Sequence, residues 1–377
     1  MTFTGKAIHS TGVFATVAED VSDDISMISP SETPLLDALA QAPMESKNVL
    51  HEWLEESLGP NTIATSAIVN DDATGFLVHD GSGGATTSVL QVGAVLKNLT
   101  TGEYVQIDGT SGNTITVTRG FGSTSAAIIT ANSTWYLVGD AALEGADVVG
   151  DISMPRVRKT NYCQIFKKDI IVSGTVQAVN HLGGIDDEYE HQRMARLRES
   201  IRDLEKTVIQ GILSGNTIGT ASAARSMKGL WEAITTNATT ATTISTIETL
   251  EGVIESAWSR GAEDLDLIIV DSVKKRQLAS LQDARVRVDQ ASGELDTFHK
   301  DISFIDTTFG RHKVLRSRWM PSNSAIITSS QRVRVVPLSG RSFAHSEVSR
   351  TGDAKKGMIV GEYTLEVRNE EGMAKIL

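Results

Sequence analysis

Cysteine is nearly absent from this chain, which holds Cys163 and no second cysteine among its 377 residues. A single cysteine excludes an intrachain disulfide and a zinc site built from cysteines, and it fits a reducing compartment. Long hydrophobic runs are also lacking, because no stretch of roughly 18 apolar residues is present to cross a membrane. The opening residues, MTFTGKAIHSTGVF, lack the charged and apolar regions of a signal peptide, so we expect synthesis and assembly in the cytoplasm.

Positively charged residues are too few for a protein whose main task is to bind nucleic acid. The chain has 35 lysines and arginines against 47 aspartates and glutamates, a net charge of −12. Phosphate binding needs a basic face, and aromatic residues, at 5%, are too sparse to form stacking platforms for single strands. The hydrophobic share of 40% is typical of a globular protein with mostly aliphatic cores.

Motifs of common enzyme classes are missing as well. No Gly-x-Gly-x-x-Gly links a strand to a helix, and neither Gly-x-Ser-x-Gly nor His-Glu-x-x-His occurs. Residues 79–84, HDGSGG, lack the Lys-Ser/Thr ending of a phosphate-binding P-loop, and we interpret them as a loop. His51 and Glu52 are neighbours on a predicted strand, where adjacent side chains face opposite ways. We therefore expect no catalysis, no cofactor and no metal site.

The first part of the chain, residues 1–46, has the pattern of an extended arm. Prolines and polar residues interrupt it, and it contains only short apolar stretches. Residues 33–39 can form one short helix, with Thr33 as N-cap and Pro34 in the first turn. Such an arm is either disordered or ordered by another subunit.

Two predicted strands, residues 47–54 and 161–173, enclose a segment of different character. From residue 81 to 139 the chain is rich in Gly, Thr and Ser, and short β-type runs alternate with turns such as Asp108-Gly109. Asp-Gly is a strong hairpin signal. We interpret this segment as a small all-β module inserted into a long hairpin.

Residues 185–214 carry the clearest helical pattern. Apolar residues recur every three or four positions, at Met194, Leu197, Ile201, Leu204, Val208 and Ile212. The charged residues between them predict a polar face, on which Arg202 and Glu205 can pair at i,i+3. At about 1.5 Å per residue this helix would be roughly 45 Å long, a spine that crosses the body of the subunit.

The remainder, residues 225–340, has an α/β pattern. Residues 265–270, LDLIIV, predict a buried strand, and Asp271 then caps a helix. The tail from residue 358 alternates as MIVGEYTLEV and predicts a β-ribbon, with Ile359, Tyr363 and Leu365 on one face.

This order of parts resembles the Hong Kong 97-type capsid fold, an α+β fold with an N-arm, an E-loop, a peripheral domain with a spine helix, and an axial domain. Local sequence resembles the SU-ten-like major head protein family of tailed phages. The matching segments are DISMISP at 24–30, NYCQIFKKDIIVSGTVQAVN at 161–180, YEHQ at 189–192, ESIRDLE at 199–205, RSMKGL at 225–230, and TGDAKKGMIVGEYTLEVRN at 351–369.

The resemblance implies a domain layout and a role. The N-arm would be residues 1–46, the E-loop hairpin 47–75 and 146–175, the inserted β module 76–145, the peripheral domain 176–224 and 341–377 with its spine helix at 185–214, and the axial domain 225–340. The chain would be a major capsid protein, with no catalytic residues, that forms pentamers and hexamers in the icosahedral head of a virion.

The resemblance also implies partners. These would be further copies of the chain, scaffold, portal and decoration proteins, and packaged double-stranded DNA bound non-specifically, with no membrane. An acidic shell that merely surrounds DNA is compatible with the net charge. Two alternatives stay open: an encapsulin-like shell around a cargo enzyme, and another virion part such as a decoration or tail protein.

Candidate intersubunit contacts come from the arm and the hairpin, and ordinary packing within the chain is the alternative for each. They are Leu35, Leu36, Leu39, Trp53, Phe166, Arg156, Arg158, Lys167 and Lys168. A second basic group can either form ion pairs or contact DNA, and comprises Arg311, His312, Lys313, Arg316 and Arg318.

Overall fold

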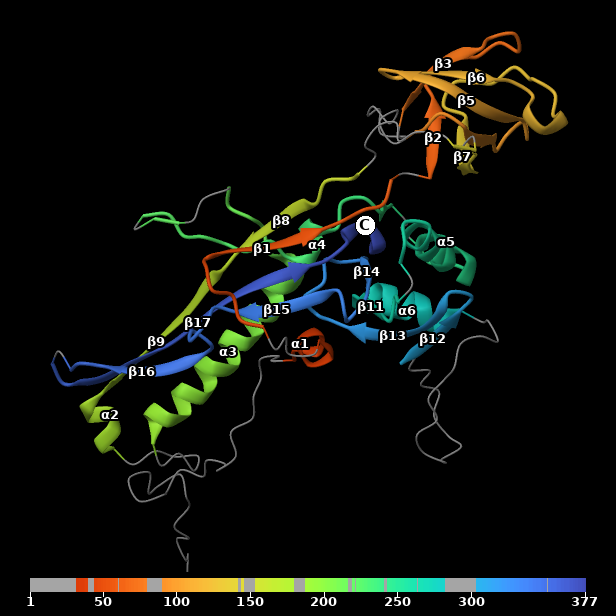
Figure 1. Cartoon of the computed structure of the whole chain (residues 1–377). Helices are drawn as coiled ribbons and strands as arrows, with labels where there is room; N and C mark the ends of the chain where they lie inside the picture. The colour runs from red at the N-terminus through yellow and green to blue at the C-terminus, as the bar shows by residue number, and fades with distance from the viewer. Residues whose placement is uncertain are drawn as a thin grey trace, which may run out of the picture. The chain divides into compact units, whose positions relative to one another are not determined.

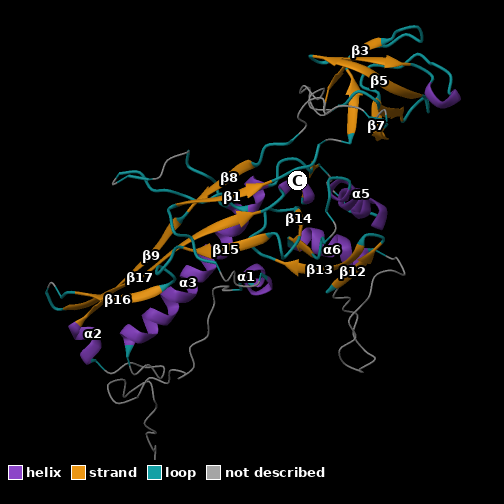
Figure 2. Ribbon diagram, in the orientation of Figure 1, coloured by secondary structure: helices purple, strands orange, loops and turns teal. Residues whose placement is uncertain are grey.

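The chain divides into two units in the computed structural model (Figures 1 and 2). Unit 1 is Met1–Trp53 with Lys159–Leu377, and unit 2 is Leu54–Arg158. The structure describes residues 32–39, 44–59, 61–79, 90–141, 144–145, 153–179, 187–215, 219–220, 222–240, 243–262, 264–281, 303–350 and 352–377. Most of the predicted arm, with the segment 24–30, and most of the glycine-rich run 79–84 lie outside these residues. None of the described helices is long and apolar enough to span a membrane.

Unit 2 is built around a closed antiparallel barrel. Its strands, in spatial order, are β2 (Thr62–Thr65), β3 (Gly75–His79), β6 (Thr114–Thr118), β5 (Tyr104–Ser111), β4 (Ala94–Asn98) and β7 (Thr134–Asp140). Alternate residues point inward around Trp135, which is fully buried and stacks on Phe76 with ring centroids 5.5 Å apart. Closure leaves no strand edge exposed. The barrel begins at β2, upstream of the module boundary expected at residue 76. The sequence does not predict this strand, because its four residues, TIAT, are too few to show a strand pattern.

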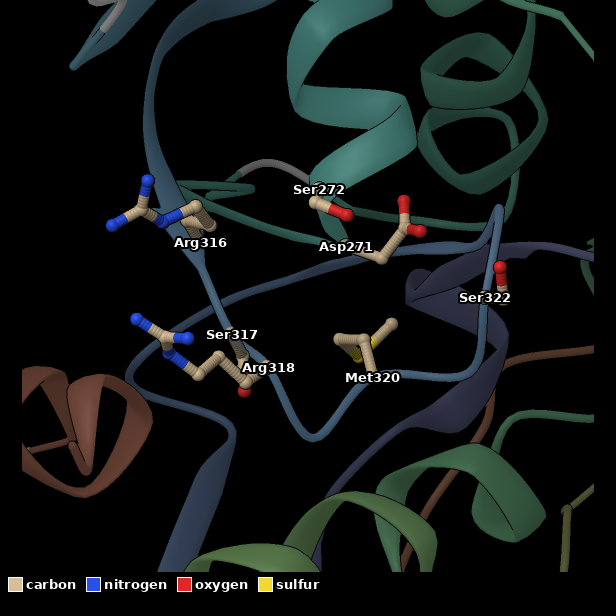
Figure 3. Close-up of a pocket in the computed structure, with 7 residues that line it drawn as sticks. All are labelled: Asp271, Ser272, Arg316, Ser317, Arg318, Met320 and Ser322. Carbon is tan, nitrogen blue, oxygen red and sulfur yellow. The ribbon is translucent and has the colours of Figure 1, made fainter. Parts of the chain in front are cut away.

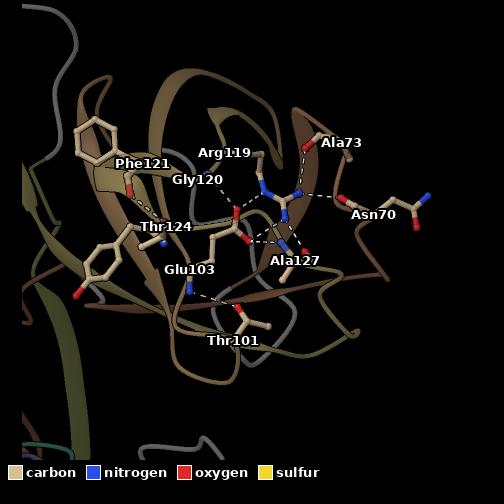
Figure 4. Close-up of polar contacts among 10 residues, drawn as sticks. Asn70, Ala73, Thr101, Glu103, Arg119, Gly120, Phe121, Thr124 and Ala127 are labelled. Atoms are coloured by element: carbon tan, nitrogen blue, oxygen red, sulfur yellow. Dashed lines mark hydrogen bonds and ion pairs between the residues drawn. The ribbon is translucent and has the colours of Figure 1, made fainter.

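A buried ion pair fastens the loops at one end of this barrel (Figure 4). Arg119 Nε lies 2.6 Å from Glu103 Oε1, and the Glu103 carboxylate also accepts the backbone N–H of Ala127 at 3.1 Å. The Arg119 guanidinium donates to the carbonyl oxygens of Asn70, Ala73 and Ala127. Burial disfavours the charged carboxyl, but the hydrogen bonds from Arg119 and the backbone outweigh it, so the pKa of Glu103 is lowered. The short helix η3 (Phe121–Ser123) follows this cluster.

Unit 1 contains a six-stranded mixed sheet. Its order is β10 (Ala238–Thr239), β18 (Ala374–Ile376), β14 (Ala325–Thr328), β11 (Leu267–Val270), β13 (Gly310–Arg316) and β12 (Phe304–Thr307). Helices α5 (Ile247–Trp258) and α6 (Ser272–Ser280) pack against it in one apolar core. The predicted cap is confirmed, since the Asp271 side chain accepts the N–H of Lys274 at 2.8 Å.

A second sheet of unit 1 is organised on one long strand, β17 (Ala354–Val367). Strand β9 (Gln164–Ser173) pairs with it along its first ten residues. On the opposite edge β17 pairs first with β16 (Ala344–Val348) and then with β15 (Val333–Pro337). The long helix α3 (Glu188–Gln210) runs along β9 and β17 (Figure 1). It packs there through Leu197 and Tyr189, which belong to one apolar cluster with Ile359. The short helix α2 (Gly174–Ala178) continues from β9.

Helix α3 runs from Glu188 to Gln210, and Asp187 caps it by accepting the N–H of Tyr189 at 2.9 Å. Its 23 residues correspond to about 35 Å, shorter than predicted. The helix ends early because the backbones of Gly211 and Gly229 come into contact, and the N–H of Gly229 donates to the carbonyl oxygen of Gly211 at 2.9 Å. A Cβ on Gly211 would lie 2.7 Å from the carbonyl oxygen of Met227, so only glycine fits this approach.

The predicted hairpin is present as two paired strands, β1 (Leu50–Glu55) and β8 (Val157–Tyr162). The strand expected at 161–173 is interrupted at Cys163, where the backbone turns its N–H to the carbonyl of Val49 at 2.8 Å. The remaining short elements are α1 (Pro34–Ala38), α4 (Leu230–Ala233) and η4 (Glu370–Gly372).

We expect Arg119→Ala to destabilise the barrel by about 3–5 kcal/mol, because it leaves the Glu103 carboxylate buried without its cation. Hydrogen exchange of barrel peptides under increasing denaturant measures this loss separately from unit 1. Lys97→Ala, which removes a partly exposed barrel cation, is the matched control and should cost about 1 kcal/mol or less. Equal effects of the two substitutions would contradict the role assigned to Arg119.

Candidate functional site

The described residues contain no cluster of three or more His, Cys, Asp or Glu side chains that could hold a metal ion. The buried polar groups of unit 1 instead join elements that are far apart in the sequence. Three such junctions hold the arm, the hairpin and the central strand β17 together, and we describe them in turn.

The first junction fastens helix α1 to helix α3. The Glu205 carboxylate accepts the backbone N–H groups of Leu35 and Leu36, each at 2.9 Å. Thr33 occupies the N-cap position as predicted, but its side chain makes no capping hydrogen bond, because Glu205 takes over that role. Glu205 is fully buried, which contradicts its predicted place on a solvated face paired with Arg202. Burial raises its pKa to about 7.

Apolar packing completes the contact of α1. Leu35 and Leu39 are 0% and 5% exposed and belong to the same core as Phe166 and Leu204. A groove of about 520 Å³ borders α1, lined among others by Leu36, Ile201 and Phe343. Leu35, Leu39 and Phe166 thus pack within their own chain, whereas Leu36 is partly exposed and its contact with another subunit stays a prediction.

The second junction fastens the hairpin to β17. His51 Nε2 on β1 lies 2.8 Å from Glu366 Oε2, and Arg368 pairs with the other carboxylate oxygen. The hydrogen bond from His51, followed by the contribution of Arg368, outweighs burial and lowers the pKa of Glu366. Asn161 on β8 adds a hydrogen bond from Nδ2 to the carbonyl oxygen of Leu365 at 2.7 Å.

The third junction surrounds Glu362 on the same strand. Arg225 Nη2 lies 2.5 Å from Glu362 Oε2, and Arg341 pairs with Oε1. Arg225 also donates from Nε to the carbonyl oxygen of Cys163 at 2.6 Å, where β8 passes into β9. One buried acid therefore connects three segments of unit 1.

Sequence patterns missed these junctions because they treat charged residues as solvated. The alternating tail predicts one buried face of β17, yet Glu362, Thr364 and Glu366 on the other face are also buried. A signal did exist for Glu205, since it lies one helical turn from Ile201 and from Ile209, beside the apolar stripe.

Three basic candidates of the hairpin have acidic neighbours within the chain. Arg156 lies 3.5 Å from Glu56 and Lys167 3.2 Å from Asp169, both in exposed pairs. Lys168 Nζ lies 2.6 Å from Asp203 on α3, so it joins β9 to the long helix. Arg158 is exposed on β8, and Trp53 is half-buried beside His51, with ring centroids 5.9 Å apart. Their contacts with other subunits stay predictions.

The second basic group is not one surface. His312 is fully buried, with Nδ1 2.5 Å from the carbonyl oxygen of Leu265, and burial lowers its pKa. Arg311 lies over the ring of Phe304. Arg316 and Arg318 line a common pocket of about 410 Å³, at the carboxyl ends of β11 and β13 (Figure 3).

The charges of this pocket largely cancel. Arg318 pairs with Glu32 at 3.2 Å, and Asp271 also lines the pocket. The Asp271 carboxylate is occupied by the N–H groups of Lys274 and Asn323, at 2.8 and 2.7 Å. Among the described residues that line this pocket, no histidine lies beside the serine hydroxyls, so these residues lack the base that a nucleophilic serine needs.

Comparison with known proteins places these features in a family. A family model described as SU10 major capsid protein matches residues 2–377. The "Major capsid protein" of Pseudomonas phage PaMx41 is 28% identical over 148 residues, which cover 39% of this chain and 34% of that relative. The match thus spans about a third of the relative's length.

Solved structures show the fold. The structure titled "The capsid of Myoviridae Phage XM1" has 9% identity and a TM-score of 0.52, with 99% of both chains covered. A chain from Microbacterium phage Oxtober96 has 11% identity and a TM-score of 0.51, covering 98% of this chain and 99% of its own. The predicted Hong Kong 97-type α+β fold is confirmed.

We expect His51→Ala to destabilise unit 1 by about 1–3 kcal/mol, because it removes a hydrogen bond to a buried carboxylate. A carboxyl with a lowered pKa stabilises the fold above its ordinary pKa, and this stabilisation is lost as the pH falls through the lowered value. The pKa of Glu366 should rise in the variant, so the acid-induced loss should start at a higher pH. Denaturant titrations between pH 7 and 3 measure both effects.

The matched control is Glu56→Gln, which removes an exposed ion pair with Arg156 and should change stability by about 1 kcal/mol or less. An unchanged acid profile in His51→Ala would show that His51 does not support Glu366.

Proposed function

Because this chain belongs to the SU10 major capsid protein family, we propose that its function is to build the shell of a tailed-phage head. Copies of the subunit associate into pentamers and hexamers, and these tile an icosahedral capsid that encloses double-stranded DNA. The family match along residues 2–377, essentially the whole chain, is the observation that carries the proposal. The protein acts as a virion component and performs no catalysis.

The physical basis of such a shell is multivalency. Each subunit contacts several neighbours over modest areas, and many weak contacts held in one geometry become stable together. In this proposal the hairpin β1–β8 is the base of the E-loop, α3 with β9 and β17 forms the peripheral domain, and the six-stranded sheet forms the axial domain. The contacts between subunits involve Leu36 and the exposed residues Arg156, Arg158 and Lys167.

The partners follow from the same role. Scaffold and portal proteins would direct assembly, and DNA would be held non-specifically within the shell. The net charge of −12 supports enclosure rather than tight binding, since a neutralised phosphate needs a lysine or arginine. An encapsulin-like shell around a cargo enzyme is the alternative, and the match to a capsid family model favours the phage head.

We assign the barrel of unit 2 a reinforcing role between neighbouring subunits. It has its own core around Trp135, so it can fold as a module without support from the hairpin. Acidic residues outnumber basic ones in residues 54–158, and such a module repels DNA and other copies of itself. Its attachment therefore relies on basic or apolar surfaces of neighbouring subunits.

Expression of the full chain, alone and with scaffold, tests the shell. Negative-stain microscopy and light scattering should show capsomers or shells on the megadalton scale. A monomer or dimer that stays unchanged at high protein concentration, with scaffold present, would overturn the proposal. Shells that copurify with a folded enzyme instead of DNA would favour the encapsulin-like alternative.

A deletion tests the barrel. Residues 62–140, the complete barrel, are replaced by a short Gly/Ser linker, which is feasible because Thr62 pairs directly with Tyr136. We expect shells that assemble but disassemble at a lower temperature than wild type, measured by light scattering on heating. Deletion shells as heat-resistant as wild type would refute the reinforcing role and leave an outward binding surface as the alternative.

A further inference from the structure

Glu205 is an unusual carboxylate because it is buried without a cation. It is fully buried in helix α3, and both of its oxygens accept backbone N–H groups from α1, which lies 170 positions earlier in the chain at Leu35. No lysine, arginine or histidine among the described residues forms an ion pair with it. Burial favours the neutral form of this carboxyl, because water no longer stabilises the charge, whereas the N–H groups of Leu35 and Leu36 favour the charged form, and the effect of burial is the larger.

The charged groups on the described elements packed around Glu205 do not neutralise the negative charge of its carboxylate. Asp37 on α1 is the charged residue that affects Glu205, and its negative charge adds to the cost of ionising Glu205. The others have different partners: Lys206 lies over the ring of Trp319, Arg202 lies 3.9 Å from Asp203, Arg318 pairs with Glu32, and Glu232 accepts the N–H of Leu213.

Helix α1 depends on this contact for its existence. It has five residues, and an isolated helix of that length is not stable in water. Its order comes from the burial of Leu35 and Leu39 and from the two hydrogen bonds to Glu205. Anything that changes the state of Glu205 therefore changes how firmly α1 is held.

We propose that the α1–Glu205 contact is a proton-linked latch, in which uptake of one proton by Glu205 favours the docked position of α1. When α1 detaches, Glu205 meets water and releases the proton, so the carboxylate returns to its ordinary behaviour. Acid thus closes the latch and alkali loosens it. The latch lies within the predicted arm, and it would set how readily this part of the chain separates from the rest of unit 1.

The direction and the size of the pH dependence of this opening follow from the linkage between proton binding and docking. Burial raises the pKa of Glu205 from its ordinary 4.5 to about 7 in the docked state. A raised carboxyl pKa stabilises the docked state fully below the lower value, and this stabilisation is lost as the pH rises through the higher one. Between pH 5 and 7 the opening equilibrium should increase on the order of 40-fold, with little further change above pH 8.

Hydrogen exchange of the full chain measures this opening directly, because the amides of Leu35 and Leu36 are the groups that Glu205 holds. Exchange of a peptide covering residues 32–39 is followed at several pH values and corrected for the rate of the unstructured peptide. We expect the corrected opening to rise by tens of fold from pH 5 to 7. A flat corrected profile in the wild-type chain would overturn the proposal.

Two variants separate a latch from a purely structural cap. Glu205→Gln keeps one acceptor oxygen but cannot ionise, so its opening should be nearly independent of pH. Asp37→Asn removes the neighbouring negative charge, and the midpoint of the wild-type profile should move to lower pH. A Glu205→Gln chain that retained the full pH dependence would assign the titration to another group and refute the latch.

Glu199→Gln is the matched control, because Glu199 lies on the same helix but pairs with Arg196 at a partly exposed position. It should retain the wild-type pH profile. Amides of β17 serve as an internal reference and should stay protected throughout, which distinguishes local opening from global unfolding. The measurement needs no shells, so its outcome is independent of the assembly test.

Discussion

The ladder between β9 and β17 is the constraint on which the rest of unit 1 depends. Ten consecutive residues of β9 pair with β17, and β16 and β15 occupy the opposite edge in succession. This pairing joins the return strand of the hairpin to the C-terminal tail, nearly two hundred positions apart. It provides the surface on which α3 packs. It also fixes the direction in which the chain runs between β9 and the hairpin strand β8. Parts that are distant in sequence thus share one backbone framework.

Buried acids complete this framework at places where elements cross. Glu205 holds α1, Glu362 holds Arg225 and Arg341, and Glu366 holds His51. Each carboxylate loses water on folding, and each regains hydrogen bonds only if the distant segment arrives in the correct position. Such groups add modest net stability, but they strongly disfavour misplaced arrangements. Geometry between segments is therefore enforced by polar contacts, while the aliphatic cores supply most of the driving force.

The elements with strong periodicity could be predicted from the sequence, and the junctions could not. The spine helix, the strand before Asp271 and the inserted β-rich segment all follow from local patterns, and the resemblance in order of parts identified the fold. The pairing of Glu205 with the arm depends on residues 170 positions apart, and no local pattern encodes it. The early end of α3 at Gln210 depends on contact between Gly211 and Gly229, which also emerges only in three dimensions.

The adjacent ends of the barrel have an evolutionary consequence. Strands β2 and β7 are neighbours, with Thr62 opposite Tyr136, so the polypeptide enters and leaves this module at nearly the same point. The two strands of the hairpin then need to span only a short distance between the ends of the inserted domain, whatever the size of that domain. Loss, gain or exchange of such cassettes requires no change in the surrounding architecture. A foreign domain with close termini could therefore take the place of the barrel at the same position.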